Sequence, residues 1–124
     1  MINKKLLIVS GTHGNELNPI MAVKKFRNLT LVGNNNYFEF ILGNPLACEK
    51  GLRYIDIDLN RSFNFKKSFL SKDLFEVQRA EQIVKEFGPE SPKGCQIVLD
   101  LHTTTSCMGT SLVMNGRRKK DFYL

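Results

Sequence analysis

Apolar residues gather in four short runs that predict β-strands. The runs occupy 5–9, 37–42, 96–101 and 110–114, and turn-forming or polar residues separate them. The second run is rich in aromatic and β-branched residues, which favour strands. The third is nearly continuous, which is typical of a strand that is buried on both faces of a sheet.

A helix is predicted over 73–87, where apolar residues recur at spacings of three and four. The expected apolar stripe consists of Leu74, Val77, Ala80, Ile83, Val84 and Phe87. Ser71 or Asp73 is expected to cap its N-terminus, and Gly88 with Pro89 to end it.

A second helix is predicted to open at Asn18 and Pro19, an N-cap residue followed by proline at the first helical position, and to end near Asn28. Its expected apolar face consists of Met21, Ala22 and Phe26. Predicted strands and helices alternate along the chain. We therefore expect an α/β fold, a sheet flanked by helices.

A long connection without clear helix or strand is expected over 46–72. Connections of this length are usually functional or disordered. This one is too rich in apolar residues to be simply disordered, and it contains the sequence RYIDIDLNR at 53–61. We therefore expect it to contribute to a functional site.

Composition and charge narrow the range of partners. A chain of 124 residues forms one domain at most. Its formal net charge is +6, but the basic residues are scattered along the sequence. A nucleic-acid-binding surface usually gathers such residues on one face, with aromatic side chains for stacking. We therefore expect no nucleic-acid partner. The positive charge is expected to steer small acidic substrates instead.

The cysteines and the apolar runs bear on the compartment. Cys48, Cys95 and Cys107 fit neither a CxxC metal motif nor a disulfide framework, which favours a reducing compartment. The apolar run at 6–9 is too short for the core of a signal peptide. No run approaches the ~20 apolar residues of a membrane span. The chain is therefore expected in the cytoplasm, without membrane contact.

Both histidines of the chain follow predicted strands. His13 and Glu16 lie in the sequence SGTHGNE at 10–16, and His102 lies in DLHTTT at 100–105. Two imidazoles and one carboxylate are a sufficient donor set for a catalytic zinc ion, which takes three protein ligands. Ligands of α/β sheets bind outside the carboxyl ends of the strands. His13, Glu16 and His102 are therefore candidate metal ligands, provided that the two strands lie close together.

A structural role for the histidines stays open at this point, because the HxxE spacing is common and a lone histidine is more often a satisfied structural side chain. Asp100 lies two residues before His102, so both side chains point to the same side of an extended strand. Asp100 is a candidate to orient an imidazole through a hydrogen bond. The alternative is a solvated residue at the end of a strand.

Arg53, Asn60 and Arg61 in the long connection are candidates for binding the substrate. An arginine fork suits bidentate binding of a carboxylate, and an arginine near zinc can stabilise an oxyanion. Each arginine taken alone also fits a surface ion pair. Asp56 and Asp58 are expected to pair locally with these arginines, and neither is given a catalytic role.

Taken together, these segments resemble the aspartoacylase and succinylglutamate desuccinylase family, which has a zinc carboxypeptidase-like fold. The resemblance runs in order through GTHGNE at 11–16, NP at 44–45, RYIDIDLNR at 53–61, EVQRA at 76–80, FGP at 87–89 and DLHTTTS at 100–106. It is somewhat closer to aspartoacylase, through 53–56 and 108–109. It implies that 1–124 forms the N-terminal portion of a mixed sheet flanked by helices.

The resemblance also implies a role for each candidate residue. His13, Glu16 and His102 would bind one Zn²⁺ per chain. Arg53 would polarise the scissile carbonyl and hold the oxyanion. The α-carboxylate of the substrate would be held by the remaining pair, Asn60 and Arg61. The implied reaction is hydrolysis of an N-acyl-aspartate, such as N-acetylaspartate, to aspartate and a carboxylate.

The chain departs from the family pattern after His102. Family enzymes are more than twice this long, and their general-base glutamate follows the third zinc ligand. No glutamate of this chain stands in that context, so we assign no catalytic base within 1–124. Two alternatives therefore stay open: a non-catalytic remnant that binds zinc, and a hydrolase closer to the succinylglutamate desuccinylases.

Overall fold

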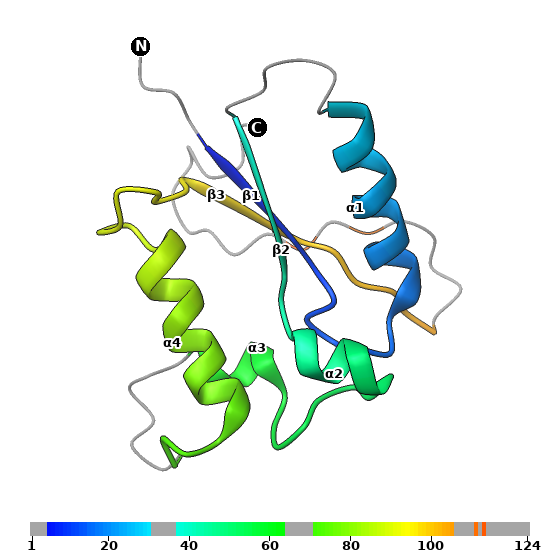
Figure 1. The fold of residues 1–124 in the computed structure, drawn as a ribbon, viewed down its shortest axis with the longest axis vertical. Helices are drawn as coiled ribbons and strands as arrows, with labels where there is room; N and C mark the ends of the chain where they lie inside the picture. Colours follow the sequence, from blue (N-terminus) through cyan, green and yellow to red (C-terminus); the bar gives the residue numbers. More distant parts are fainter. Residues whose placement is uncertain (1–4, 31–36, 64–70, 106–110, 112, 114–124) are drawn as a thin grey trace.

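The computed structural model describes residues 5–30, 37–63, 71–105, 111 and 113 (Figure 1). Strands and helices alternate along this part of the chain. In order they are β1 (Leu6–Ser10), α1 (Leu17–Thr30), β2 (Phe38–Leu42), α2 (Pro45–Lys50), α3 (Leu59–Ser62), α4 (Phe75–Phe87) and β3 (Ile97–Asp100).

The three described strands form a parallel sheet in the order β2-β1-β3. In the register of the sheet, Leu6 of β1 lies beside Phe38 of β2 and Ile97 of β3. Parallel pairing brings the carboxyl ends of β1 and β3 to the same edge of the sheet. The two strands that precede His13 and His102 are thus direct neighbours.

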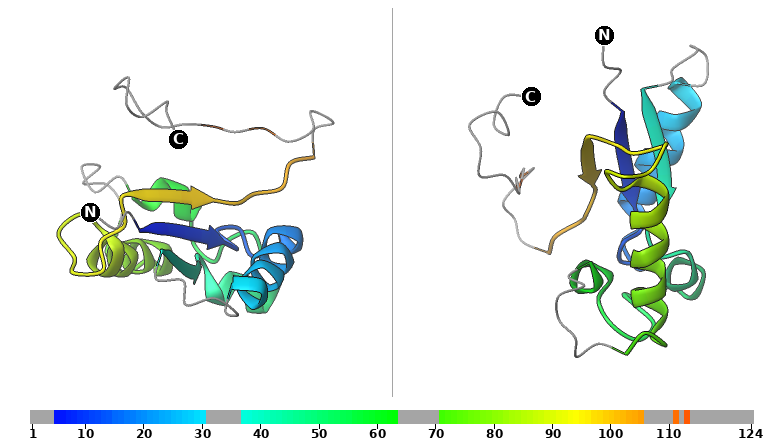
Figure 2. Two further views of the ribbon diagram at one scale, coloured as in Figure 1. Left: turned by 90° about the horizontal axis from the view of Figure 1, so that it is seen from above. Right: turned by 90° about the vertical axis from the view of Figure 1, so that its left-hand side faces the viewer.

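Helices cover both faces of this sheet. Figures 1 and 2 show α1 and α4 on opposite sides of it. The core between the sheet, α3 and α4 consists of Leu7, Val9, Leu59, Ala80, Ile83 and Phe87. On the other face, Phe26 of α1 packs edge-on against Phe38 and Phe40 of β2, with ring centroids 5.7 and 6.0 Å apart. The predicted α/β fold with a helix-flanked sheet is confirmed.

Three of the four predicted strands are present, but the expected burial of the third is wrong. Val98 in β3 is 60% exposed. Within the described residues β3 pairs only with β1, so it lies at the edge of this sheet. The fourth predicted strand, at 110–114, falls mostly outside the described residues.

Helix α4 forms, but it begins two residues later than predicted and Val84 of the expected apolar stripe is 41% exposed. Its N-terminus is also capped in another way. The N-cap residue Leu74 makes no side-chain cap, and Ser71 hydrogen-bonds to Asp73 instead of to the helix. The carboxylate of Asp56 accepts the free amide of Phe75 at 2.8 Å. A residue of the preceding connection, 19 positions away, therefore performs the capping.

Helix α1 also forms, one residue earlier than the predicted cap at Asn18, and its expected apolar face is only partly correct. Met21 is 64% exposed and Ala22 is also exposed, whereas Phe26 packs against β2 and Val23 is buried. The helix therefore directs Val23 and Phe26 toward the sheet, and Met21 and Ala22 away from it. Few apolar residues in this segment follow a helical period, so the sequence specified its orientation only weakly.

Two short helices that the sequence did not predict, α2 and α3, lie in the connection over 46–72, with α2 beginning one residue before it. Asn44 caps α2 by accepting the amide of Ala47 at 3.1 Å, and Pro45 takes the first helical position. Gly51 ends this helix in the left-handed region, with φ of 64°. Helices of four and six residues are too short to show a period.

Candidate metal centre

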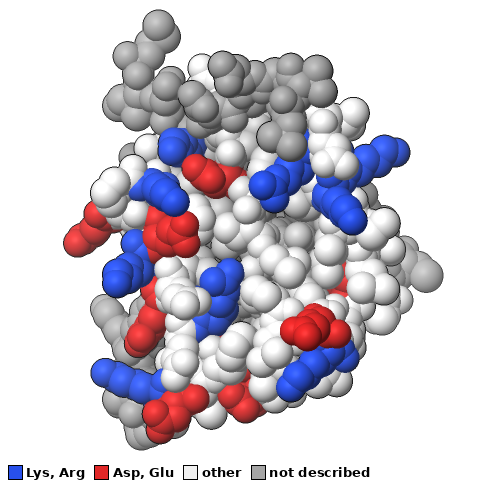
Figure 3. Space-filling model, viewed as in Figure 1, with Lys and Arg blue, Asp and Glu red and all other residues white. Residues whose placement is uncertain are grey.

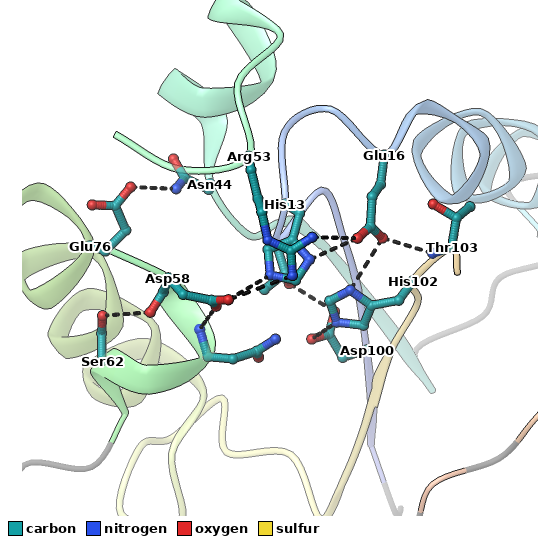
Figure 4. Close-up of polar contacts among 12 residues, drawn as sticks. His13, Glu16, Asn44, Arg53, Asp58, Ser62, Glu76, Asp100, His102 and Thr103 are labelled. Carbon is teal, nitrogen blue, oxygen red and sulfur yellow. Dashed lines mark hydrogen bonds and ion pairs between the residues drawn. The ribbon is translucent and has the colours of Figure 1, made fainter. Parts of the chain in front are cut away.

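The three candidate metal ligands meet at the carboxyl edge of the sheet. His13 and Glu16 come from the loop after β1, and His102 comes from the segment after β3 (Figure 4). One ligand atom from each residue lies within 4.8 Å of the others. The sequence could not show that the two strands are adjacent, and the pairing of β1 with β3 supplies this condition.

Two glycines allow the loop after β1 to take its path. Gly11 has φ of +65°, which favours glycine. Gly14 packs so closely on α2 that an added Cβ would lie 2.1 Å from the carbonyl carbon of Ala47. The amide of Gly14 also donates to the carbonyl of Arg53 at 3.2 Å. The loop that carries His13 is thus seated against both α2 and the following connection.

The carboxylate of Glu16 faces both imidazoles. Its Oε1 lies 2.8 Å from Nδ1 of His13, and its Oε2 lies 3.2 Å from Nδ1 of His102. The amide of Thr103 donates to Oε2 at 2.7 Å. His13 and Glu16 are only 5% and 8% exposed. The two Nδ1 atoms and the carboxylate therefore point toward one another, with His13 and Glu16 buried and His102 exposed.

The outward nitrogens of both rings are held by further carboxylates. Nε2 of His13 lies 3.1 Å from Oδ2 of Asp58, and Nε2 of His102 lies 2.8 Å from Oδ2 of Asp100. The hydroxyl of Thr12 donates to the other oxygen of Asp100 at 2.8 Å. The expected contact of Asp100 with an imidazole is confirmed. Metal-binding histidines usually donate their second N–H to a carboxylate in this way.

Asp58 is a site residue that the sequence analysis missed. It was expected to pair locally with an arginine, and Arg53 does lie 3.7 Å from Oδ2. Its contact with His13 spans 45 positions, and nothing in the local alternation of 55–59 indicates it. The available signal was its place inside the RYIDIDLNR segment, which carries the family resemblance.

The electrostatics of the group favour a bound cation. Burial raises the pKa of Glu16, but hydrogen bonds from Thr103 and His13 outweigh it and hold the pKa below its ordinary value. Burial also raises the pKa of Asp58, but its hydrogen bonds outweigh this effect and lower the pKa. The hydrogen bond that the His102 ring donates to Asp100 raises the pKa of His102. Ionised carboxylates thus surround two imidazoles.

This donor set fits a zinc ion. Four-coordinate zinc with bonds of about 2.0–2.2 Å separates its ligand atoms by roughly 3.3 Å. The contacts of 2.8 and 3.2 Å between Glu16 and the two Nδ1 atoms are close to that separation. Because Asp58 and Asp100 hold the Nε2 atoms, the Nδ1 atoms are the ones directed to a metal.

The three predicted substrate residues differ in how close they lie to this group. Nη1 of Arg53 is 3.8 Å from Oε1 of Glu16, and its side chain is 52% exposed. Asn60 and Arg61 lie in α3, the helix that begins directly after Asp58. Both are exposed, and neither side chain makes a hydrogen bond or ion pair with the described part of the chain. Arg53 therefore reaches the metal centre, whereas the other two adjoin it through α3.

Comparison with known proteins gives the family. Residues 2–123 match the model of the succinylglutamate desuccinylase/aspartoacylase catalytic domain. The chain belongs to this family. A "probable aspartoacylase" of Prochlorococcus marinus (strain MIT 9215) is 55% identical over 127 residues, and that of strain MIT 9313 is 42% identical over 130 residues. Both alignments cover 100% of this chain and 42% of the relative.

A solved structure supports the same family. The crystal structure of murine aminoacylase 3 matches with a TM-score of 0.63 and 28% sequence identity. The match covers 80% of this chain and 35% of that protein. The resemblance predicted from the sequence motifs is thus confirmed. The chain spans less than half the length of the curated relatives that it matches.

The surface charge and the helices bear on the expected partners. On the face drawn in Figure 3, basic side chains of the described residues are dispersed and interspersed with acidic ones. None of the helices in the described ranges is both long and apolar enough to cross a membrane. The absence of nucleic-acid and membrane partners stays a prediction.

Proposed function

We propose that this chain carries the metal-binding part of a cytoplasmic, zinc-dependent amidohydrolase that acts on N-acyl-aspartate, such as N-acetylaspartate. The observation that carries the proposal is the convergence of His13, Glu16 and His102 beside Arg53. Membership of the succinylglutamate desuccinylase and aspartoacylase family supports it. So do the curated relatives described as probable aspartoacylases.

The residues of the chain would divide the work as follows. His13, Glu16 and His102 hold one Zn²⁺, and Asp58 with Asp100 keeps the Nε2 atoms protonated so that Nδ1 can bind the metal. When bound, zinc supplies Lewis acidity that lowers the pKa of water and polarises an amide carbonyl.

Arg53 would support the same carbonyl from the side of Glu16, where its guanidinium already lies. Its positive charge would then stabilise the negative charge that develops on the carbonyl oxygen during hydrolysis. Asn60 and Arg61, exposed on α3, would bind the α-carboxylate of the substrate. We assign no general base within the described residues.

Elemental analysis of the purified chain tests the metal site. We expect about one zinc per folded chain, lost on His102→Ala and retained in Glu81→Gln, which removes an exposed carboxylate of α4. A folded chain without zinc contradicts the proposal.

An assay of amide hydrolysis separates the proposed reaction from its alternatives. Release of aspartate from N-acetylaspartate is expected to exceed release of glutamate from N-succinylglutamate. The opposite order would favour a desuccinylase. Zinc binding without either activity would favour a non-catalytic remnant.

A further inference from the structure

Glu76, in the first turn of α4, is a fully buried carboxylate whose partners come from two other segments. Its exposed fraction is 0%. Oε1 accepts from Nδ2 of Asn44 at 2.8 Å and from the amide of Ile55 at 2.7 Å. Oε2 accepts from the amides of Asp56 and Ile57 at 3.0 and 3.2 Å. Four donors thus occupy the acceptor positions that an ionised carboxylate offers.

The charge of Glu76 is stabilised by dipoles. In the part of the chain that the structure describes, it forms no ion pair with lysine or arginine. Burial raises its pKa, but the hydrogen bonds from Ile55, Asp56, Asn44 and Ile57 outweigh it and lower the pKa. Three successive amides form a concave anion site of the kind that backbone N–H groups make. The carboxylate is therefore ionised and fixes the backbone of 55–57.

Asp56 makes a second hydrogen bond between the connection and α4. While its amide donates to Glu76, its own carboxylate accepts the amide of Phe75 at 2.8 Å. A carboxylate of α4 thus accepts amides of the connection, and a carboxylate of the connection accepts an amide at the N-terminus of α4. Neither side can shift without losing charge-assisted hydrogen bonds, which are stronger than neutral ones.

Two residues of the metal centre flank the fixed segment 55–57. Arg53 lies two positions before Ile55, and its carbonyl accepts the amide of Gly14 at 3.2 Å. Asp58 directly follows Ile57, and its carboxylate holds Nε2 of His13. Figure 4 shows Glu76 on the side of Asp58 that is remote from the imidazoles.

We propose that Glu76 is a positioning residue for the metal centre. It holds the backbone of 55–57 so that Asp58 orients His13 and Arg53 faces Glu16. The inference rests on the proposed zinc site, but its mechanical part, the placement of Asp58 against His13, is independent of metal. This difference allows the two to be tested separately.

The first test uses the metal-free chain. Glu76→Gln keeps the side-chain shape but turns an NH₂ group toward backbone amides that need an acceptor. We expect the ¹⁵N and ¹H signals of the His13 ring to lose the signature of a hydrogen-bonded Nε2–H. The ring of His102, which Asp100 orients from β3, should be unchanged. Equal changes in both rings, or in neither, would overturn the proposal.

The second test measures zinc affinity by competition with a chelator. Glu76→Gln is expected to weaken zinc binding by about 10-fold, the lower end of the effect of losing a partner of a metal-binding histidine. Ile83→Val is the matched control, because it weakens the core packing of the same helix and leaves the hydrogen bonds of Glu76 to 55–57 in place. If Ile83→Val weakens zinc binding equally, Glu76 has only a structural role and the proposal is wrong.

A double-mutant cycle tests whether Glu76 acts through Asp58. Because both changes remove the same restraint on His13, Glu76→Gln combined with Asp58→Asn should weaken zinc binding little more than Asp58→Asn alone. Additive losses would contradict the proposal. If the wild-type chain binds no zinc, the proposed function fails while the comparison of the two histidine rings still decides the role of Glu76.

A second variant covers the case in which Glu76→Gln does not fold. Asp56→Ala removes the hydrogen bond to Phe75 at an exposed side chain and leaves the carboxylate of Glu76 in place. A smaller change in the same His13 signals is expected. Unchanged His13 signals in this variant would overturn the proposal.

Discussion

The carboxylate of Asp58 lies 3.1 Å from Nε2 of His13, across 45 residues of sequence. The contact leaves Nδ1 of the same ring directed at Glu16, 2.8 Å away. Asp100, at the end of β3, holds Nε2 of His102 in the same way. Each imidazole is therefore held between two carboxylates, one of which, Glu16, is shared.

Asp58→Asn is expected to weaken zinc binding by about 10- to 100-fold. The substitution keeps the size of the side chain and removes the charge that stabilises the Nε2–H of His13. Competition with a chelator measures the affinity, and Asp73→Asn, at an exposed position before α4, is the control. Equal affinities of the two variants would show that Asp58 does not support the metal.

Arg53→Lys is expected to weaken the binding of N-acetylaspartate, through the lost contact with its amide carbonyl, more than the binding of zinc. Lysine keeps the charge but loses the planar fork, and a hydrogen bond to a charged group contributes about 2 kcal/mol. Calorimetric titration of the zinc-loaded chain with N-acetylaspartate measures this loss. Arg27→Lys on α1 is the matched control. A zinc affinity that falls as far as that of Asp58→Asn would place Arg53 among the supports of the metal instead.

Glu76 is expected to make the stability of the chain depend on pH in the acid range. Its pKa is lowered in the folded state, so its contribution is present above the ordinary value of 4.5 and is lost as the pH falls through the folded-state pKa. Urea unfolding at a series of pH values should show a steeper loss for wild type than for Glu76→Gln. The two free energies of unfolding should converge in strong acid. Parallel curves would mean that Glu76 does not titrate with folding.

Gly14→Ala is expected to destabilise the chain by about 3 kcal/mol, the upper end of the usual cost of overpacking, because the new Cβ meets backbone atoms of α2. Gly51→Ala is the control for backbone strain alone. An added Cβ at Gly51 meets nothing within 4 Å, but its φ of +64° costs a non-glycine residue about 1–2 kcal/mol. Urea denaturation gives both free energies. Equal losses would mean that the loop can move away from α2.

The sequence predicted those parts of the fold that local patterns determine. The strands at β1, β2 and β3 and the stripe of α4 were recognised because their apolar residues follow a period or form a run. The exposure of Val98 and Met21 was not predicted, since it depends on which neighbouring elements cover each face. Periodicity identifies an element, whereas its orientation follows from tertiary packing.

The candidate site was predicted as a set of residues but not as an arrangement. The motifs named His13, Glu16 and His102, and the structure brings them together. Asp58 and Glu76 were missed because their partners lie far away in the sequence, and a buried carboxylate leaves no local signature. Contacts of this kind follow only once the strands are paired and α4 is docked.

The pairing of β1 with β3 has a consequence for the order of events during folding. Leu6 and Ile97 become neighbours only when the chain closes a loop of about 90 residues, and such closures are slow compared with local helix formation. His102 follows β3, so the third ligand arrives last. Metal capture and the pairing of β3 with β1 should therefore occur as one kinetic step, and the nascent chain should hold metal tightly only after β3 has docked.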